Sequence, residues 1–356
     1  MKNEVHSIRN LTFYSYKFSF WHFFNVKRFI PNIIKNLKSY KELLNLSSKE
    51  EKINLLIWGK SEDFEPDTLS DNIKIYRVED GFIRSVGLGI RFTPPISLVI
   101  DPAGIYFDAA RPSYLEQILL EDSFDSELIE RAEHVIEKIK KQRITKYNLN
   151  EKPWRPTKTS KKIVVIPGQV ETDASIRYGS PFIKSNLELI KIVRKLNPDA
   201  YIVHKPHPDV VRGYRKGYIK FDELKKYCNE VVLACSSVSL IEASDEIHTL
   251  TSLFGFEALL YSRKVATYGQ PFYSGYGLTH DICPNERRNK KRTLQELVVA
   301  SLIIYPLYSS LINGKIIDIE EAIDEISFLI RKRPFKLKIL NLIQAIADPF
   351  LKMRRF

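Results

Sequence analysis

The sequence predicts an α/β protein built from two Rossmann-like parallel-sheet domains that face a cleft. Short β-branched runs alternate with helix-like segments on both sides of a polar stretch, and this alternation is typical of parallel sheets covered by helices. The chain has 356 residues, of which 44% are hydrophobic and 28% charged. That length and composition suffice for two globular domains, each with its own core.

Composition divides the chain into five parts. An N-terminal arm (1–50) precedes the first Rossmann-like domain (51–147), and a linker (148–162) leads to the second (163–330). A basic tail (331–356) follows. The linker is predicted from its two prolines, its many lysines and its low apolar content, which are typical of a connection rather than of a helix or strand.

Local patterns predict the elements of each domain. In the first domain we expect strands at 53–58, 73–78 and 97–100, a helix that begins at Pro112-Ser113, and a helix over 128–141. In the second domain we expect strands at 163–166, 200–203, 231–235, 247–250 and 265–268, with helices over 186–196, 251–262, 293–307 and 317–330. Apolar runs without polar alternation indicate strands that are buried on both faces.

The net charge restricts the classes of molecule that the protein is expected to bind. A net charge of +12 favours an anionic partner such as a phospholipid surface, a charged substrate or nucleic acid. Nucleic-acid binding has no recognition motif in its favour. Three cysteines without paired spacing fit a reducing compartment. We expect no signal peptide, and charges and a proline interrupt the aromatic segment 11–34 before it reaches the roughly 20 apolar residues of a membrane span.

The tail has a separate character. Residues 331–356 carry eight basic residues and one acid, with apolar residues at helical spacing. A basic amphipathic helix of this kind fits the anionic cytoplasmic surface of a membrane. The alternative is a last helix packed across the domain junction with its basic face in solvent.

Two neighbouring strand ends in the second domain predict a ligand crevice. The strand at 163–166 is followed by a polar loop that contains Gln169 and Asp173, and the strand at 200–203 runs into Lys205 and His207. Ligands of open α/β sheets bind outside the carboxyl ends of the strands. We therefore expect a carboxylate that acts as nucleophile or base to face an anion-binding cluster. Two parallel-sheet domains that face each other are the architecture of many sugar-nucleotide-dependent transferases (GT-B-like), which have the active site in the cleft between the domains.

Adjacent carboxylates follow a strand of the first domain. Glu79 and Asp80 repel each other, and this repulsion can raise one pKa into the range of a general acid or base. Gly81 after them allows close approach of a ligand to the backbone. The alternative is an ordinary acidic turn.

Three further polar elements belong to the second domain. Thr251 and Ser252 stand where a strand leads into a helix, a position that can bind phosphate. Glu257 can accept hydrogen bonds from the two ribose hydroxyls of a nucleotide. The alternative is that Thr251 or Ser252 caps the helix and Glu257 is a surface charge on it. The loop 269–279, with Gln270, can line a sugar pocket or be a tight connection. Arg287 can clamp a carboxylate bidentately or lie on the surface.

A metal site that contains His204 and His207 is weakly supported, because no further cluster of His or Cys supplies the remaining ligands. We expect His204 to be structural and no metal to be bound.

Taken in this order, the motifs resemble one family, the KpsC-type capsule enzymes, which are retaining β-Kdo glycosyltransferases of Gram-negative bacteria. The matching blocks are Arg77 to Gly89, Pro167 to Ser175, Lys205 to Val210, His248 to Ser252 with Gly255 to Leu260, and Tyr268 to Thr279. Long blocks in a constant order are more specific than any short pattern. The match is closer to the second of the two transferase modules that this family carries in tandem, and this chain has length for one.

The resemblance implies a donor, a mechanism and roles for the residues. CMP-β-Kdo would be the donor, and retention would proceed through a covalent Kdo-Asp intermediate. Asp173 would be the nucleophile, and Glu79 or Asp80 the acid/base. Lys205 and His207 would hold the CMP phosphate, which makes a divalent metal or other cofactor unnecessary. The remaining substrate-binding and nucleotide-binding residues would be Gln169, Thr251, Ser252, Glu257, Gln270 and Arg287.

The resemblance also implies a setting for the reaction. The first domain would bind the acceptor, a Kdo-bearing glycolipid or polysaccharide, and the second would bind the CMP-sugar. The protein would be cytoplasmic and peripheral on the anionic inner face of the cytoplasmic membrane, in contact with other capsule-assembly proteins. The alternative is a non-catalytic capsule assembly or export factor that binds the acceptor glycolipid, against which the intact Asp173, acidic pair and His207 argue.

Overall fold

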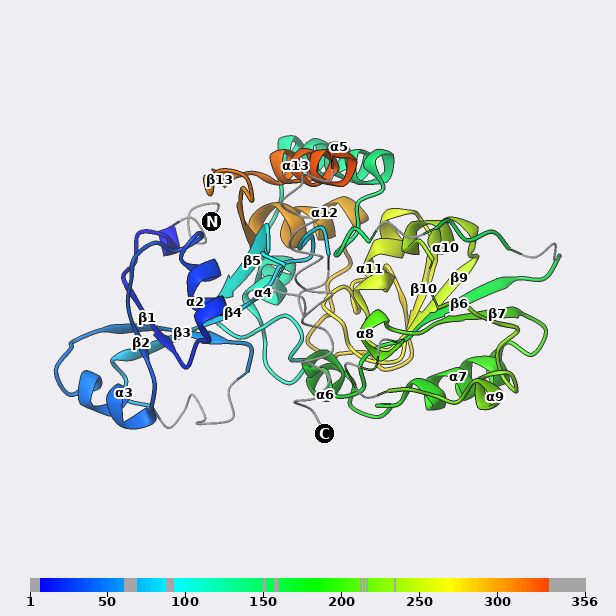
Figure 1. Cartoon of the computed structure of the whole chain (residues 1–356), viewed down its shortest axis with the longest axis horizontal. Helices are drawn as coiled ribbons and strands as arrows, with labels where there is room; N and C mark the ends of the chain where they lie inside the picture. Colours follow the sequence, from blue (N-terminus) through cyan, green and yellow to red (C-terminus); the bar gives the residue numbers. More distant parts are fainter. Residues whose placement is uncertain are drawn as a thin grey trace.

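The computed structural model describes residues 7–60, 69–87, 93–149, 152–156, 160–211, 213, 215, 217–233 and 235–332. The chain forms two lobes that lie side by side, each organised around one β-sheet (Figure 1). Helices surround both sheets and fill the space between them. The predicted α/β class with two sheets is confirmed.

The first sheet has seven strands among the described residues, in the order β13-β12-β5-β4-β3-β1-β2. The strands are β1 (Phe13–Tyr16), β2 (Ile33–Leu37), β3 (Ile53–Trp58), β4 (Ile73–Asp80), β5 (Ser97–Asp101), β12 (Pro306–Ser309) and β13 (Ile316–Ile317). The pairs within β4-β3-β1-β2 are parallel, whereas β5, β12 and β13 join antiparallel. This sheet is therefore mixed rather than purely parallel, and an antiparallel neighbour needs no crossover helix.

The second sheet is parallel throughout its described strands, in the order β11-β10-β9-β6-β7-β8. The strands are β6 (Ile163–Pro167), β7 (Tyr201–Lys205), β8 (Glu230–Val231), β9 (Glu246–Thr249), β10 (Lys264–Thr267) and β11 (His280–Asp281). The central strand β6 is buried along its whole length, as an apolar run in a sheet covered on both faces should be. The carboxyl ends of β6, β7 and β9 therefore meet at one edge, toward the junction with the first lobe.

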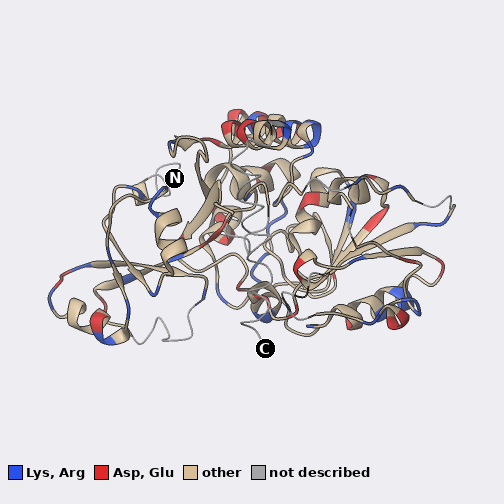
Figure 2. Ribbon diagram, in the orientation of Figure 1, with Lys and Arg blue, Asp and Glu red and all other residues tan. Residues whose placement is uncertain are grey.

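The helices follow the predicted pattern with shifted ends. They are α2 (Phe20–Val26), α3 (Tyr40–Ser47), α4 (Tyr114–Glu121), α5 (Ser126–Gln142), α6 (Ala174–Gly179), α7 (Asn186–Leu196), α8 (Pro208–Val211), α9 (Phe221–Leu224), α10 (Ser237–Ala243), α11 (Leu253–Leu260), α12 (Leu294–Val298), the π-helix η3 (Val299–Ile304) and α13 (Ile319–Lys332). In Figure 1, α5 and α13 lie together across the top of the junction. Both helices carry acidic and basic residues (Figure 2), and ion pairs of Arg131 with Glu320 and of Lys138 with Asp324 join them.

One prediction about the chain is wrong, and another is right except at its end. The expected N-terminal arm supplies β1 and β2 to the first sheet, where Phe13 is fully buried. The helix expected over 293–307 is confirmed over 294–304 by α12 and η3, but its last residues belong to β12, which returns from the second lobe and pairs with β5. Both differences have one cause, since strand pairing over a long sequence separation leaves no local pattern in the sequence. The Arg28 guanidinium ties the two segments together by donating to the carbonyls of Ser309 and Ser310.

The described part of the linker contains no helix or strand, but it is anchored. Trp154 is buried, its backbone N–H donates to Ser239 Oγ over 2.7 Å, and its indole N–H donates to Glu230 over 2.8 Å. Residues 333–356, most of the predicted basic tail, lie outside the described residues. None of the described helices combines the length and the apolar character that crossing a bilayer requires.

An aromatic cluster joins the lobes beneath the predicted site. Phe82 of the first lobe stacks on Phe272 of the second with ring centroids 4.2 Å apart, and Tyr106 and Phe256 complete the group. Phe82 is three residues from Glu79, and Phe256 adjoins Glu257. Packing of these large rings therefore sets how the acidic motif of the first lobe faces the second lobe.

Candidate active site

Asp173 is an accessible carboxylate at the edge of the second sheet. It follows the loop after β6 and is the N-cap of α6, where its Oδ1 accepts from the N–H and the hydroxyl of Ser175, each over 3.0 Å. Its Oδ2 lies 3.9 Å from the guanidinium of Arg215. The side chain is 43% exposed. This carboxylate is thus held in one orientation and open to a ligand.

His207 follows β7 and belongs to the same group. Its Nδ1 accepts the backbone N–H of Asp209 over 3.1 Å, so the ring proton of the neutral imidazole is on Nε2, where it can be donated to an anion. Burial lowers the pKa of His207, and the charges of Asp209 and Asp173 act in the opposite direction. The ring is therefore neutral at neutral pH, and it lies within electrostatic reach of Asp173.

The neighbours of His207 on β7 point inward. The Lys205 ammonium is buried and donates to the Cys235 carbonyl over 2.7 Å. His204 is buried against the Ile166 carbonyl, and burial lowers its pKa to about 4. His204 is structural, as expected. Gly168 permits this arrangement, because a Cβ there would lie 3.0 Å from Pro206 Cα and 3.1 Å from the backbone nitrogen of His207.

Glu79 and Asp80 have different environments. Both lie in β4, which extends two residues further than predicted because Glu79 pairs with Val99 of β5, and Asp80 with Leu98. Burial, followed by the charge of Asp80, raises the pKa of Glu79 to about 8. Asp80 accepts the Arg84 Nε–H over 2.6 Å. Glu79 is thus the member of the pair that holds a proton near neutral pH.

Gly81 does not have the role that the sequence suggested. A Cβ at Gly81 would collide with the hydroxyl of Ser97 on β5, and the Gly81 N–H donates to the Ser97 carbonyl over 3.1 Å. The glycine makes room for a neighbouring strand of the protein itself. It does not bring the backbone to a ligand.

Lys146 is a member of the site that the sequence analysis missed. Its pKa is raised: burial lowers it, but Tyr147, Tyr106, Asp80 and Glu79 raise it by more. Its ammonium lies 5.4 Å from the ring centroid of Tyr147 and forms no ion pair with any described residue. Lys146 also affects the pKa of His207, so it is within electrostatic reach of both the acidic pair and His207.

No motif marks Lys146, because it stands at the end of the first domain beside the linker. The fold holds Lys146 at the site through its backbone N–H, which donates to Glu257 Oε1 over 2.8 Å. Its carbonyl accepts from the N–H groups of Arg84 and Ser85. Tyr106 is a second residue that the sequence analysis missed; burial raises its pKa, so its hydroxyl stays protonated.

Gln169 and Thr251 are joined by hydrogen bonds across the sheet edge, and the hydroxyl of Thr249 connects Ser252 to them. Gln169 Oε1 accepts the Thr251 N–H over 3.0 Å, and Gln169 Nε2 donates to the Thr251 hydroxyl over 3.0 Å. Ser252 is the N-cap of α11 and accepts the N–H of Phe254 over 3.2 Å. The capping alternative therefore describes Ser252, and these hydrogen bonds keep the loop after β6 beside the start of α11.

Glu257 connects the lobes at the level of the site. Burial raises its pKa to about 7, although Lys146 and Lys205 lower it. One carboxylate oxygen is engaged by the backbone N–H of Lys146. Contact with a ribose stays a prediction.

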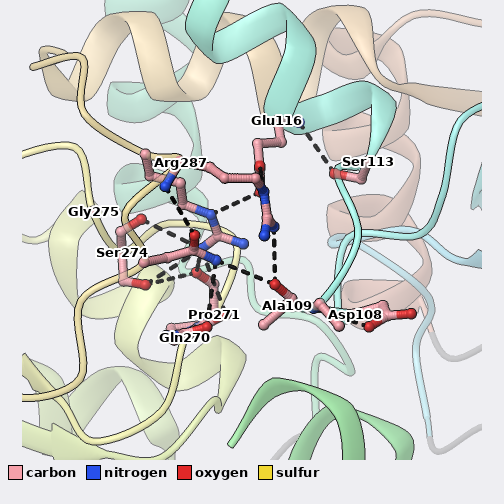
Figure 3. A network of polar contacts seen from close by, with 12 residues as sticks. Asp108, Ala109, Ser113, Glu116, Gln270, Pro271, Ser274, Gly275 and Arg287 are labelled. Atoms are coloured by element: carbon pink, nitrogen blue, oxygen red, sulfur yellow. Dashed lines mark hydrogen bonds and ion pairs between the residues drawn. The ribbon is translucent and has the colours of Figure 1, made fainter. Parts of the chain in front are cut away.

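The side chains of Arg287 and Gln270 contact other groups of the protein near the place where the two lobes meet. Arg287 clamps a carboxylate bidentately, as predicted, but the carboxylate is that of Glu116 on α4 in the first lobe, at 2.7 and 3.3 Å. Figure 3 shows Arg287 also reaching the Ala109 carbonyl, over 2.9 Å. The side chain of Gln270 donates to the Pro284 carbonyl over 3.0 Å. The expectation that Arg287 is available to a substrate is thus corrected, because a charge of the protein itself occupies it.

The structure therefore brings Asp173, His207, Glu79 and Lys146 into one cluster where the lobes meet. The charge of Asp173 contributes to the raised pKa of Glu79 and acts on His207. An accessible carboxylate, a protonated carboxyl group and two donors for anions suit displacement at a carbon that bears an anionic leaving group. The described residues contain no group of His, Cys, Asp or Glu able to hold a metal ion.

Comparisons with known proteins show which proteins this chain is similar to. A family model described as capsule polysaccharide biosynthesis protein matches residues 65–154 and 151–316. The capsule polysaccharide modification protein LipA of Neisseria meningitidis serogroup A is 43% identical over 288 residues, which are 80% of this chain and 40% of LipA. The lipopolysaccharide-processing protein LpsZ of Rhizobium meliloti is 39% identical over 274 residues, 75% of this chain and 62% of LpsZ. This chain thus spans less than two thirds of either relative.

Two solved structures share the fold over most of their length. The KpsC beta Kdo 2,7 transferase of Thermosulfurimonas dismutans is 50% identical, with a TM-score of 0.79, and the match covers 90% of this chain and 99% of that one. The KpsC beta Kdo 2,4 transferase of the same organism is 30% identical, with a TM-score of 0.76 and coverage of 89% and 98%.

Proposed function

Because the chain belongs to the capsule polysaccharide biosynthesis protein family, we propose that it transfers Kdo from CMP-β-Kdo to a Kdo-containing lipid or polysaccharide acceptor, with retention of configuration. The similarity to two Kdo transferases supports the choice of sugar. The observation that carries the proposal is the pairing of two carboxyl groups across the junction, an accessible Asp173 and a protonatable Glu79.

In the first half-reaction, the Asp173 carboxylate attacks the anomeric carbon of Kdo. The bond from that carbon to the phosphate oxygen breaks, CMP leaves with the electron pair, and an ester joins Kdo to Asp173. The hydrogen bonds from Ser175 orient the attacking carboxylate. The Nε2–H of His207 donates to the departing phosphate, which needs no protonation because its oxygen is already weakly basic.

In the second half-reaction, an acceptor hydroxyl attacks the same carbon, and Glu79 takes its proton as the ester to Asp173 breaks. Glu79 suits this role better than Asp80, whose carboxylate is paired with Arg84. Ester formation removes the negative charge of Asp173, one of the charges that raise the pKa of Glu79. The base therefore becomes slightly easier to ionise at the step that needs it.

Lys146 has a role that the chemistry of Kdo suggests. Kdo is a sugar acid with a carboxylate attached directly to its anomeric carbon. The Lys146 ammonium lies near both Glu79 and His207 without an ion pair among the described residues. We assign it to the sugar carboxylate, which it would hold beside Asp173.

The comparisons also favour one linkage. Identity to the 2,7 transferase is 50%, against 30% for the 2,4 transferase. We therefore expect a β-2,7 linkage between the transferred Kdo and the acceptor Kdo.

The test is a transfer reaction with CMP-Kdo and a short synthetic Kdo-lipid. CMP release, the product mass and NMR of the product report donor, number of sugars, configuration and linkage in one experiment. We expect CMP release that depends on the acceptor, and a product with a β-2,7-linked Kdo. Binding of the Kdo-lipid without CMP release would instead favour the non-catalytic assembly factor.

A further inference from the structure

The segment between Ser7 and Lys41 has a charge composition unlike the rest of the chain. It contains seven Lys or Arg residues and no Asp or Glu. The seven are Arg9, Lys17, Lys27, Arg28, Lys35, Lys38 and Lys41. The exposed lysines make the surface of this segment cationic, although Lys35 pairs with Glu42.

The inward face of α2 is firmly packed. The His22 ring stacks on the indole of Trp58, with centroids 4.0 Å apart and planes 3° apart, and Asn25 and Val26 are buried. Arg28, just after the helix, is turned inward to carbonyl groups of the protein. The helix is therefore a rigid part of the first lobe.

The outward face of α2 carries two large apolar side chains in solvent. Phe20 is 86% exposed and Phe24 is 64% exposed, and their rings stack with centroids 6.4 Å apart. The spacing of four residues places them on one face of the helix. Lys27, three residues after Phe24, is exposed beside them, with its ammonium 5.0 Å from the ring centroid of Phe23.

The helix α2 lies at the end of the first sheet that also carries the acidic pair. Trp58, on which α2 rests, ends β3 and lies at the same sheet edge as Glu79 and Asp80 of β4. Asp80 and Arg84 both affect the pKa of His22, which burial lowers. The helix α2 thus lies near the acidic pair on the first lobe, with its inward face on Trp58 and its exposed aromatic face turned outward.

We propose that the outward face of α2, formed by Phe20, Phe24 and Lys27, docks the protein onto an anionic lipid bilayer. The aromatic rings enter the headgroup region, and the surrounding cations, with no acid between Ser7 and Lys41, meet the anionic headgroups. Charge complementarity between the exposed lysines of this segment and anionic headgroups favours this partner. Docking through this face places the first lobe, which carries the acidic pair, next to the membrane surface.

The test uses the full chain and vesicle co-sedimentation, so its result does not depend on the proposed sugar chemistry. The probes are vesicles of phosphatidylglycerol mixed with phosphatidylcholine, and vesicles of phosphatidylcholine alone. The double variant Phe20→Ser/Phe24→Ser should lower partitioning onto the anionic vesicles by about tenfold or more, and Lys27→Glu by about tenfold. Phe182→Ser is the matched control, because Phe182 is 78% exposed on the second lobe, and we expect no change.

Because all four side chains are exposed, thermal unfolding of each variant should match that of the wild type. Unchanged partitioning of the double variant would overturn the proposal. So would wild-type protein that binds both kinds of vesicle equally or neither kind. A double variant that keeps its affinity for vesicles but changes from dimer to monomer in analytical ultracentrifugation would show that this face binds a second copy of the chain instead.

Discussion

Asp173 and Glu79 are carboxylic acids of the same candidate site, yet the two lobes give them opposite surroundings. Asp173 caps a helix at the exposed edge of the second sheet, accepts two hydrogen bonds from Ser175, and is 43% exposed. Glu79 lies in a strand of the first sheet, where burial and the charge of Asp80 raise its pKa to about 8. One is therefore an available nucleophile, and the other is a proton carrier near neutral pH.

The difference shows that environment, rather than residue type, separates the two roles. Hydrogen bonds to a carboxylate favour its charged form, and loss of water disfavours it. The lobes supply these two conditions separately, and the aromatic cluster of Phe82 and Phe272 keeps the two groups at one junction. Substitution of one residue at a time separates the contributions of the two lobes.

The largest effect is expected from Asp173→Asn. Asn remains a good helix N-cap, so the fold of α6 is kept while the nucleophile is lost, and turnover should fall by at least about a thousandfold. The measurement is CMP release together with the intact mass of the protein after incubation with CMP-Kdo. We expect no covalent adduct, and an unchanged melting temperature serves as the control. Turnover within tenfold of the wild type would remove Asp173 from the mechanism.

Glu79→Gln should affect only the second half-reaction. Loss of a general base lowers turnover by roughly a hundredfold to a thousandfold, while the covalent adduct still forms and accumulates in the intact mass spectrum. In the wild type, a base must be unprotonated, so the acceptor step should accelerate as the pH rises toward about 8. The variant should lack this rise. An unchanged pH profile would assign the proton transfer to another group.

Lys146→Met separates recognition of the sugar from recognition of the nucleotide. A charge-assisted contact with the Kdo carboxylate is worth roughly 1.5–3 kcal/mol, so affinity for CMP-Kdo should fall by about tenfold to a hundredfold. Affinity for CMP, which lacks the carboxylate, should be unchanged. Calorimetric titration in the Asp173→Asn background avoids turnover, and Lys146→Arg is the matched control that keeps the charge. An equal loss for both ligands would place Lys146 at the nucleotide.

Glu257→Gln should have the smallest effect, on stability rather than on chemistry. The pKa of Glu257 is raised by burial from its ordinary value of 4.5 to about 7 in the folded protein, so the fold loses stability as the pH rises from about 4.5 to about 7. Gln keeps an acceptor for the Lys146 N–H but cannot ionise. The variant should therefore gain stability relative to the wild type between pH 5 and pH 8, by roughly 1–3 kcal/mol. Urea unfolding at both pH values measures the difference, and equal pH dependence would contradict the burial of this charge.

The sequence alone determined the α/β class, most strand positions and the motifs at the strand ends. Apolar runs such as 163–166 are local signals, and polar residues just beyond them meet at one sheet edge in any parallel sheet. The same local logic identified Ser113 and Ser252 at helix starts and predicted that His204 is structural.

Only the tertiary structure decided which charges face each other. The return of β12 to the first sheet, the partnership of Arg287 with Glu116, and the recruitment of Lys146 all join residues far apart in the chain. The distinction between Glu79 and Asp80 arises in the same way, since the guanidinium of Arg84 pairs with Asp80 and not with Glu79 among the described residues. Desolvation and ion pairing depend on neighbours in space, and a linear pattern contains no record of them.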